Sequence, residues 1–302
     1  MTKRIVLLVF ILLSLVCRCY SEELKDIWGR SVESKIPFKR IISLYGAHTE
    51  NLFYLGLDKE IIGVGIHDDY PEKVKTKPRF SYHDGPEKFV AANPDLILVR
   101  PMIVRGYKDL FLKLKDFGIE VVSLQPTNFK EMLDYWLKLG RLTGKEKAAK
   151  KMVSDFLTEL HKIKSLVSSI PYSKRKKVFL ESIHRKFKTF APNSISMFVL
   201  ESAGGINIAK DAIRVRHTNI AYYGKERILA KGDKIDFYIA QVGPMNPITK
   251  ETILNEPGFK AIKAVREGKV FLIKEEILSR PTPRIILGIK KIAKILYPEV
   301  FR

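Results

Sequence analysis

Residues 143–169, TGKEKAAKKMVSDFLTELHKIKSLVSS, decide how this chain is organised. Apolar side chains recur there every three or four residues, the spacing that keeps one face of a helix buried. They are Ala149, Met152, Val153, Phe156, Leu157, Leu160, Ile163 and Val167. Thr143 and Glu146 have the spacing of a capping box, and Pro171 stops the helix from continuing. A helix of about 26 residues spans roughly 39 Å. The stretch is therefore either a long surface helix or a rigid connection between two domains.

Short β-rich runs alternate with helical patterns on both sides of this helix. The expected strands are residues 40–45, 61–65, 95–99 and 119–124 before it, and 178–183, 206–209, 235–241 and 270–273 after it. Such alternation is typical of parallel sheets covered by helices. One helix-strand segment, residues 87–99, is weakly repeated at 226–240. We therefore predict an α/β fold of two Rossmann-like lobes with mostly parallel sheets, joined by one long helix, with a ligand cleft between them.

The predicted boundaries follow from this pattern. The N-terminal lobe takes residues 22–142, the connecting helix residues 143–170 and the C-terminal lobe residues 171–302. Each lobe is long enough to bury a hydrophobic core of its own. A stiff connecting helix predicts that the lobes close only slightly on a ligand.

The first 21 residues have the pattern of a signal peptide. Two basic residues precede an apolar segment at residues 5–16, which is too short to cross a bilayer as a helix. We expect cleavage after Ser21 and export of the mature chain to the periplasm. Lipid attachment at Cys17 or Cys19 is the alternative, although the residues before Cys17 fit it poorly.

Cysteine content and charge limit the chemistry of the mature protein. Both cysteines lie in the segment to be removed, so neither a disulfide nor a thiolate site is expected. The net charge is +21, and removal of Lys3, Arg4 and Arg18 leaves +18. Such a charge suits nucleic acid, an acidic membrane surface or an anionic small molecule. Export argues against nucleic acid, and a generally basic solvated surface remains an alternative.

Candidate ligand-binding residues lie in loops that follow the expected strands, where parallel α/β sheets bind their ligands. Five of the six histidines have such positions: His48, His67, His83, His184 and His217. The same loops contain aromatic and cationic residues, namely Tyr45, Arg100, Arg185, Lys188, Arg216 and Arg280. Arg side chains bind carboxylate or catecholate oxygens in pairs, and aromatic rings stack on flat ligands. These residues predict a cleft for a large anionic ligand with flat or chelating parts.

Signs of an enzyme are weak. The chain contains no GxSxG, HExxH or Walker-type loop. A metal-dependent hydrolase built on His67, Asp68 and Asp69 is one alternative, and direct capture of a free transition metal by a His/Asp/Glu cluster is another. We expect no enzymatic activity.

Several stretches resemble the substrate-binding proteins of ABC importers for iron–siderophore, haem and cobalamin. They include residues 40–65 (RIISLYGAHTENLFYLGLDKEIIGVG), 93–101 (NPDLILVRP), 118–126 (GIEVVSLQP), 203–209 (AGGINIA) and 279–299 (SRPTPRIILGIKKIAKILYPE). The resemblance covers nearly the whole mature chain, but no single motif in it specifies a ligand. It implies two lobes on a rigid helical connector.

The resemblance also implies partners. Its ligand would be a metal chelate, such as a ferric siderophore, a corrinoid or haem, and the protein would have no cofactor of its own. It would act as a monomer and deliver the chelate to an ABC permease with its ATPase. Family members present one acidic residue from each lobe to the permease, and the matching positions here are Glu87 and Glu226.

Overall fold

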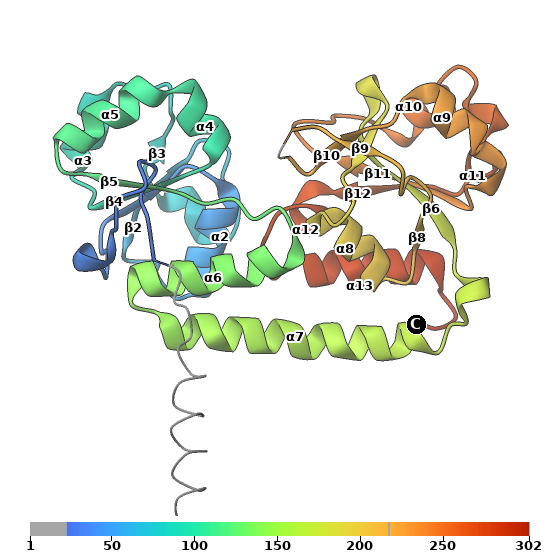
Figure 1. The fold of residues 1–302 in the computed structure, drawn as a ribbon, viewed down its shortest axis with the longest axis horizontal. Coiled ribbons are helices and arrows are strands. Elements are labelled where there is room, and N and C mark those ends of the chain that lie inside the picture. The colour runs from blue at the N-terminus through green and yellow to red at the C-terminus, as the bar shows by residue number, and fades with distance from the viewer. Residues whose placement is uncertain (1–22, 217, 302) are drawn as a thin grey trace, which may run out of the picture.

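The computed structural model describes residues 23–216 and 218–301. Two α/β lobes stand side by side on a base of three helices, α6 (Phe129–Thr143), α7 (Glu146–Ser168) and α13 (Ile285–Leu296) (Figure 1). The predicted signal peptide, residues 1–21, lies outside the described residues. The two-lobed α/β architecture predicted from the alternation of strands and helices is confirmed.

The N-terminal lobe contains a wholly parallel sheet with the strand order β3-β2-β1-β4-β5. Its strands are β1 (Ile41–Ser43), β2 (Ile61–Gly65), β3 (Arg79–Phe80), β4 (Leu96–Val99) and β5 (Glu120–Ser123). Its helical segments are η1 (Glu33–Lys35), α2 (Gly46–Tyr54), η2 (Glu72–Thr76), α3 (Pro86–Ala92), α4 (Pro101–Gly106) and α5 (Lys108–Asp116). Every residue of β1 and β4 is buried, as expected of central strands covered on both faces.

The C-terminal lobe contains a mixed sheet with the order β12-β11-β6-β7-β10-β9, and β8 pairs with β6. Parallel pairing joins β6, β8, β11 and β12, whereas β7, β9 and β10 pair antiparallel. Its strands are β6 (Lys177–Ile183), β7 (Lys188–Phe190), β8 (Ile206–Asn207), β9 (Ile213–Arg214), β10 (Ile220–Tyr222), β11 (Phe237–Val242) and β12 (Val270–Lys274). The sequence does not predict β7, β9 and β10, because strands of two or three residues are too short for an alternating pattern.

Short helices connect the strands of this lobe. They are η3 (Tyr172–Lys174), η4 (His184–Lys186), α8 (Ile195–Ser202), α9 (Lys225–Ala230), η5 (Gly232–Lys234), α10 (Lys250–Leu254), η6 (Phe259–Ala261), α11 (Lys263–Arg266) and α12 (Glu275–Leu278). No helix in the described part of the chain combines the length and hydropathy that a membrane span requires.

The weak sequence repeat has a structural counterpart at the amino ends of the strands. Asp95 precedes β4 and accepts hydrogen bonds from the backbone N–H groups of Lys39 and Arg40, just before β1, at 2.7 and 2.9 Å. Asp236 precedes β11 and accepts a hydrogen bond from the backbone N–H of Lys177, the first residue of β6, at 2.9 Å. Each aspartate thus satisfies backbone donors that a neighbouring strand would otherwise leave unpaired.

The long helix α7 begins later than the sequence predicts. Thr143 is the last residue of α6, and its Oγ1 donates a 2.8 Å hydrogen bond to the carbonyl oxygen of Leu139. The predicted capping box with Glu146 is therefore wrong. Gly144 has a φ of 65°, a left-handed conformation that ends α6 and allows the chain to reverse into α7.

One hydrophobic core runs through the base and continues into both lobes. The inward face of α7 contributes Ala149, Met152, Phe156, Leu160, Ile163 and Val167, which are six of the eight residues predicted for its apolar face. Phe129 of α6, in the base, stacks on Phe198 of α8 in the C-terminal lobe, with ring centroids 4.0 Å apart. The lobes therefore share packed side chains, and a wide hinge movement would have to break this packing.

Candidate functional site

The N-terminal lobe has its topological switch point between β1 and β4. The chain leaves β1 toward β2 and β3 on one side, and leaves β4 toward β5 on the other. Parallel α/β sheets bind ligands just beyond the carboxyl ends of the strands at such a point. Tyr45 lies two residues beyond the end of β1, and Arg100 directly follows β4. The fold thus brings together two of the predicted ligand-binding residues.

Tyr45 and Arg100 form a cation–π pair at this switch point. The guanidinium carbon of Arg100 lies 4.5 Å from the centroid of the Tyr45 ring. Burial raises the pKa of the Tyr45 phenol, although Arg100 and Arg280 oppose this effect, so the hydroxyl remains protonated near neutral pH. Nε of Arg100 is buried and has no hydrogen-bond partner among the described residues. The pair therefore offers a flat ring and an unused guanidinium donor.

A segment of the C-terminal lobe faces this pair. Residues 275–284 follow β12 and comprise α12 and a proline-rich turn that enters α13. Arg280 and Glu275 are 3.5 Å apart at Nη2 and Oε1. Both residues act electrostatically on Tyr45, and Arg100 acts on Glu275. We call Tyr45, Arg100, Glu275 and Arg280 the interlobe site, because the two lobes contribute two residues each.

The same segment anchors the lobes to each other through Glu50, whose side chain has no exposed surface. Oε1 of Glu50 accepts a 2.6 Å hydrogen bond from Nη1 of Arg280 and another of 2.6 Å from Nη2 of Arg284. Oε2 accepts a 2.8 Å bond from Nε of Arg284. Beside this cluster, Asn51 and the indole of Trp136 each donate a 3.0 Å hydrogen bond to the carbonyl oxygen of Pro281. The buried Glu50 carboxylate, which binds both arginines, thus fixes the position of the Arg280 side chain in the interlobe site.

A second buried carboxyl group, Asp68, lies close to Arg280. Burial raises the pKa of Asp68 to about 6, against the opposing effect of hydrogen bonds from Thr49 and the backbone of Gly65. A Cβ atom on Gly46 would lie 3.2 Å from Nη1 of Arg280 and 3.3 Å from Oδ1 of Asp68. The glycine that begins α2 therefore makes room for this close approach.

The predicted histidines in residues 23–216 do not gather around the interlobe site. His48 is buried, its Nε2 donates to the carbonyl oxygen of Val99 at 3.1 Å, and the Tyr135 hydroxyl donates to Nδ1 at 2.6 Å. Burial lowers the pKa of His48 to about 4, so the ring is neutral near pH 7. Both of its nitrogens already have a hydrogen-bond partner. We correct our expectation of a ligand-facing His48 for this reason.

His67 and His83 lie in exposed turns after β2 and β3. His83 packs against Tyr82 and Tyr107, and the Tyr107 hydroxyl lies 3.1 Å from its Nδ1. Within residues 23–216 and 218–301, no three His, Cys, Asp or Glu side chains are grouped so that they could hold a metal ion.

The candidates of the C-terminal lobe are also dispersed. His184 is buried with its Nδ1 3.0 Å from Oε1 of Glu181, which makes it part of the lobe interior rather than an open site. Arg185 and Arg216 are exposed, and the Lys188 amine lies 4.3 Å from the centroid of the Tyr222 ring. His217 lies outside the described residues. Of the predicted cleft residues, the described contacts join only Tyr45, Arg100 and Arg280 in one interlobe group, with His48 behind Tyr45.

Glu87 and Glu226 have matching local structures in the two lobes. Each is exposed in the first turn of a short helix, α3 or α9, and each helix has a glycine at its N-cap, Gly85 or Gly224. A carboxylate in the first helical turn is favoured by the helix dipole. The structure thus presents an exposed carboxylate at matching positions of the two lobes.

Three important residues were not among the predicted ligand-binding residues: Glu50, Asp68 and Glu275. Asp68 had entered only through the hydrolase alternative. Glu50 lies on a helix between buried neighbours, and a carboxylate in such surroundings implies a buried cationic partner. That signal was present in the sequence, but it does not identify the partner.

Residues 41–277 match a family model described as periplasmic binding protein. An uncharacterized ABC transporter substrate-binding lipoprotein of Bacillus subtilis (strain 168) is 25% identical over 284 residues, which cover 92% of this chain and 86% of the relative. A vitamin B12-binding protein of Vibrio vulnificus (strain YJ016) is 24% identical over 260 residues, covering 85% of this chain and 90% of the relative.

Solved structures also resemble the fold. The crystal structure of a possible iron-binding (periplasmic solute-binding) protein from Staphylococcus epidermidis matches with a TM-score of 0.74 and 29% identity, covering 86% of this chain and 99% of that chain. These similarities extend over both lobes and the helix between them.

Proposed function

Since the chain belongs to the periplasmic binding protein family, we propose that it captures a metal chelate outside the cytoplasm and delivers it to the permease of an ABC importer. The permease and its ATPase would be its partners, and the protein would act as an exported monomer that performs no catalysis. The ligand class is a ferric siderophore, a corrinoid or haem. Names of relatives support this range, since one relative is a vitamin B12-binding protein and one is a possible iron-binding protein.

One observation carries the choice of ligand class: the Arg100 guanidinium on the Tyr45 ring at the switch point, opposite Arg280. Two arginines suit carboxylate or catecholate oxygens, and an aromatic ring suits a flat ligand surface. No histidine among the described residues joins this group with a free ring nitrogen, so the ligand would be bound as a complete chelate. The protein would recognise the organic part of that chelate rather than the metal.

Small lobe movements would accompany binding. The shared core along α7 and the ion pairs of Glu50 with Arg280 and Arg284 both connect the lobes. Bringing the lobes together by a large rotation would break these contacts. Small-angle X-ray scattering should therefore give nearly equal radii of gyration with and without ligand.

Spectroscopic titration of the purified protein with ferric siderophores, haem and cobalamin tests the proposal. One of the three should bind with a micromolar or lower Kd, and Arg100→Ala should weaken that binding at least about tenfold. Arg266→Ala is the matched control, because Arg266 is a half-exposed residue of α11 that pairs with Asp233 of η5. Absence of binding to all three chelates would contradict the proposed ligand class.

A further inference from the structure

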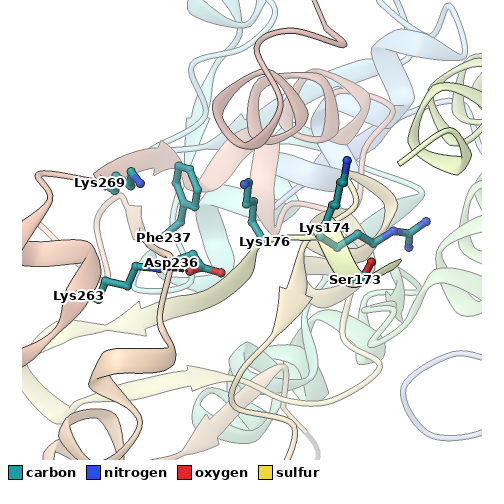
Figure 2. Close-up of a pocket in the computed structure, with 8 residues that line it drawn as sticks. Ser173, Lys174, Lys176, Asp236, Phe237, Lys263 and Lys269 are labelled. Atoms are coloured by element: carbon teal, nitrogen blue, oxygen red, sulfur yellow. Dashed lines mark hydrogen bonds and ion pairs between the residues drawn. The ribbon is translucent and has the colours of Figure 1, made fainter. Parts of the chain in front are cut away.

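A second group of charged residues lies far from the interlobe site, around a hollow of about 370 Å³ in the C-terminal lobe (Figure 2). We call it the basic pocket. Its lining residues are Ser173, Lys174, Arg175, Lys176, Asp236, Phe237, Lys263 and Lys269. Figure 2 shows the side chains of Lys174, Lys176 and Phe237 rising in the same direction from neighbouring segments.

The topology of the sheet brings these residues together. The strands β6, β11 and β12 are parallel neighbours, so their amino ends lie at one edge of the sheet. Lys176 directly precedes β6, Asp236 precedes β11 and Lys269 precedes β12. Ligands of the interlobe site would approach the opposite edge, where the strands end. The basic pocket is therefore independent of the proposed transport ligand.

Positive charge is in large excess in the basic pocket. Five of the lining residues are lysine or arginine, and Asp236 is the one carboxylate among them. Asp236 already binds the Lys263 amine at 2.7 Å and the backbone N–H of Lys177 at 2.9 Å, while Lys269 pairs with Glu267 at 2.6 Å. Within the described residues, Lys174 and Lys176 have no carboxylate within ion-pair distance.

The corresponding edge of the N-terminal lobe has carboxylates as well as the cations Lys39 and Arg40. There Asp95 precedes β4 and Glu120 begins β5, and the Glu120 carboxylate is paired with Lys35. Carboxylates thus stand at two of the strand starts of that lobe. In the C-terminal lobe β12 begins with the apolar Val270, and Lys269 precedes it. Gathering like charges destabilises a protein unless counterions balance them. Asp236 and Glu267 pair with Lys263 and Lys269, so Lys174 and Lys176 are the charges that a bound anion would neutralise.

We propose that the basic pocket binds a phosphate group. Lysine amines, the Arg175 guanidinium and the Ser173 hydroxyl are all hydrogen-bond donors, and a phosphate supplies several acceptor oxygens with up to two negative charges. The Arg175 guanidinium donates a 3.4 Å hydrogen bond to the carbonyl oxygen of Val167, and its buried Nε has no hydrogen-bond partner among the described residues. The hollow is large enough for a phosphate with a further group attached, either a free phosphate compound or the headgroup of an anionic lipid.

Calorimetric titration with inorganic phosphate and pyrophosphate, at constant ionic strength set with chloride, tests the pocket directly. The double variant Lys174→Gln/Lys176→Gln should bind at least about tenfold more weakly than the unmodified protein. The control Lys147→Gln/Lys150→Gln removes the same charge from exposed positions on α7 and should leave binding unchanged. In buffer without phosphate, the pocket variant should melt no lower than the control, because it loses repulsion rather than a structural contact.

Co-sedimentation with vesicles identifies the source of the phosphate group. The vesicles would contain one part phosphatidylglycerol to three parts phosphatidylcholine, with pure phosphatidylcholine for comparison. Weaker vesicle binding by the pocket variant than by the control supports the proposal with a lipid headgroup as the source. Equal vesicle binding together with pocket-dependent phosphate binding supports it with a free phosphate compound. If the pocket and control variants behave alike in both assays, the proposal is overturned.

Discussion

The two lobes bury the same kinds of ionisable residue but give them different partners. Each lobe has a glutamate without exposed surface, Glu50 or Glu181, and a buried histidine that follows its first strand, His48 or His184. In the C-terminal lobe the two residues meet, since Nδ1 of His184 lies 3.0 Å from Oε1 of Glu181. The Tyr238 hydroxyl donates to the same carboxylate at 2.7 Å.

In the N-terminal lobe the corresponding residues separate. Glu50 turns to Arg280 and Arg284 of the other lobe, and His48 binds only the neutral partners Tyr135 and Val99. A carboxylate paired within its own lobe stabilises that lobe, whereas one paired across the interface fixes the relative position of two lobes. The comparison thus separates local stability from the placement of Arg280 in the interlobe site.

Glu50→Gln gives the strongest test of this difference. It would leave Arg284 without a carboxylate and Arg280 with only its 3.5 Å contact to Glu275. The Glu50 carboxylate is fully buried, and breaking a buried ion pair costs about 3–5 kcal/mol. Glu181→Gln should cost less, about 1–3 kcal/mol, because an amide still accepts a hydrogen bond from Tyr238. Guanidinium unfolding curves of the two variants measure both losses in free energy of unfolding.

The critical result is that Glu50→Gln lowers the free energy of unfolding more than Glu181→Gln does. A loss below about 1 kcal/mol for Glu50→Gln would mean that the ion pairs with Arg280 and Arg284 do not hold the lobes together. Glu87→Gln serves as the control, because Glu87 is exposed and has the same chemistry. It should change the free energy of unfolding by no more than about 0.5 kcal/mol.

Local patterns in the sequence were sufficient to predict the general fold. Strands β2 and β4 are short apolar runs, and α7 has an apolar face. Both patterns involve residues close in sequence, so they can be recognised within a short window of the chain. The start of α7 was mispredicted because Thr143 has a competing local partner, the carbonyl oxygen of Leu139 in α6. Side-chain spacing alone cannot distinguish the end of one helix from the start of the next.

The candidate site was only partly predictable for a different physical reason. Ligands bind beyond the carboxyl ends of parallel strands, and Tyr45 and Arg100 come just after β1 and β4. Their position near a ligand can therefore be predicted from the order of strands and helices along the chain. Arg280 meets Glu50 across 230 positions of sequence, and no periodic pattern encodes that pairing. The histidine rule failed at His48 because a residue after a strand can also face the core, where hydrogen bonds to Tyr135 and Val99 satisfy it.

The two histidines should give the stability of the protein opposite dependences on pH. The pKa of His48 falls from 6.5 to about 4 on folding, so its contribution is present above pH 6.5 and is lost as pH falls toward 4. That loss amounts to about 3 kcal/mol over the whole interval. The hydrogen bond with Glu181 raises the pKa of His184, so its contribution is present below pH 6.5 and is lost as pH rises through the higher folded value.

Urea unfolding between pH 4 and 8 measures these contributions when each variant is subtracted from the unmodified protein. The difference for His48→Gln should shrink toward acidic pH, and the difference for His184→Gln should shrink toward alkaline pH. Asp68, whose folded pKa is raised to about 6, opposes His48 in the same acidic interval, and the subtraction removes its effect. If the differences in unfolding free energy for His48→Gln and His184→Gln both rose, or both fell, with increasing pH, the proposed contrast between the lobes would be contradicted.

Glu87 and Glu226 occupy matching positions in the two lobes, and this likeness can also be tested. If each lobe presents its carboxylate to a basic residue of the permease, Glu87→Arg or Glu226→Arg should lower uptake of the identified chelate at least about tenfold. Ligand affinity should stay unchanged in both variants, because each glutamate is exposed in the first turn of a short helix. Glu146→Arg, at the exposed first turn of α7, is the matched control and should transport normally. A reduction of uptake in only one lobe's variant would mean that docking depends on a single lobe, and a loss of ligand affinity would place that glutamate in the binding site instead.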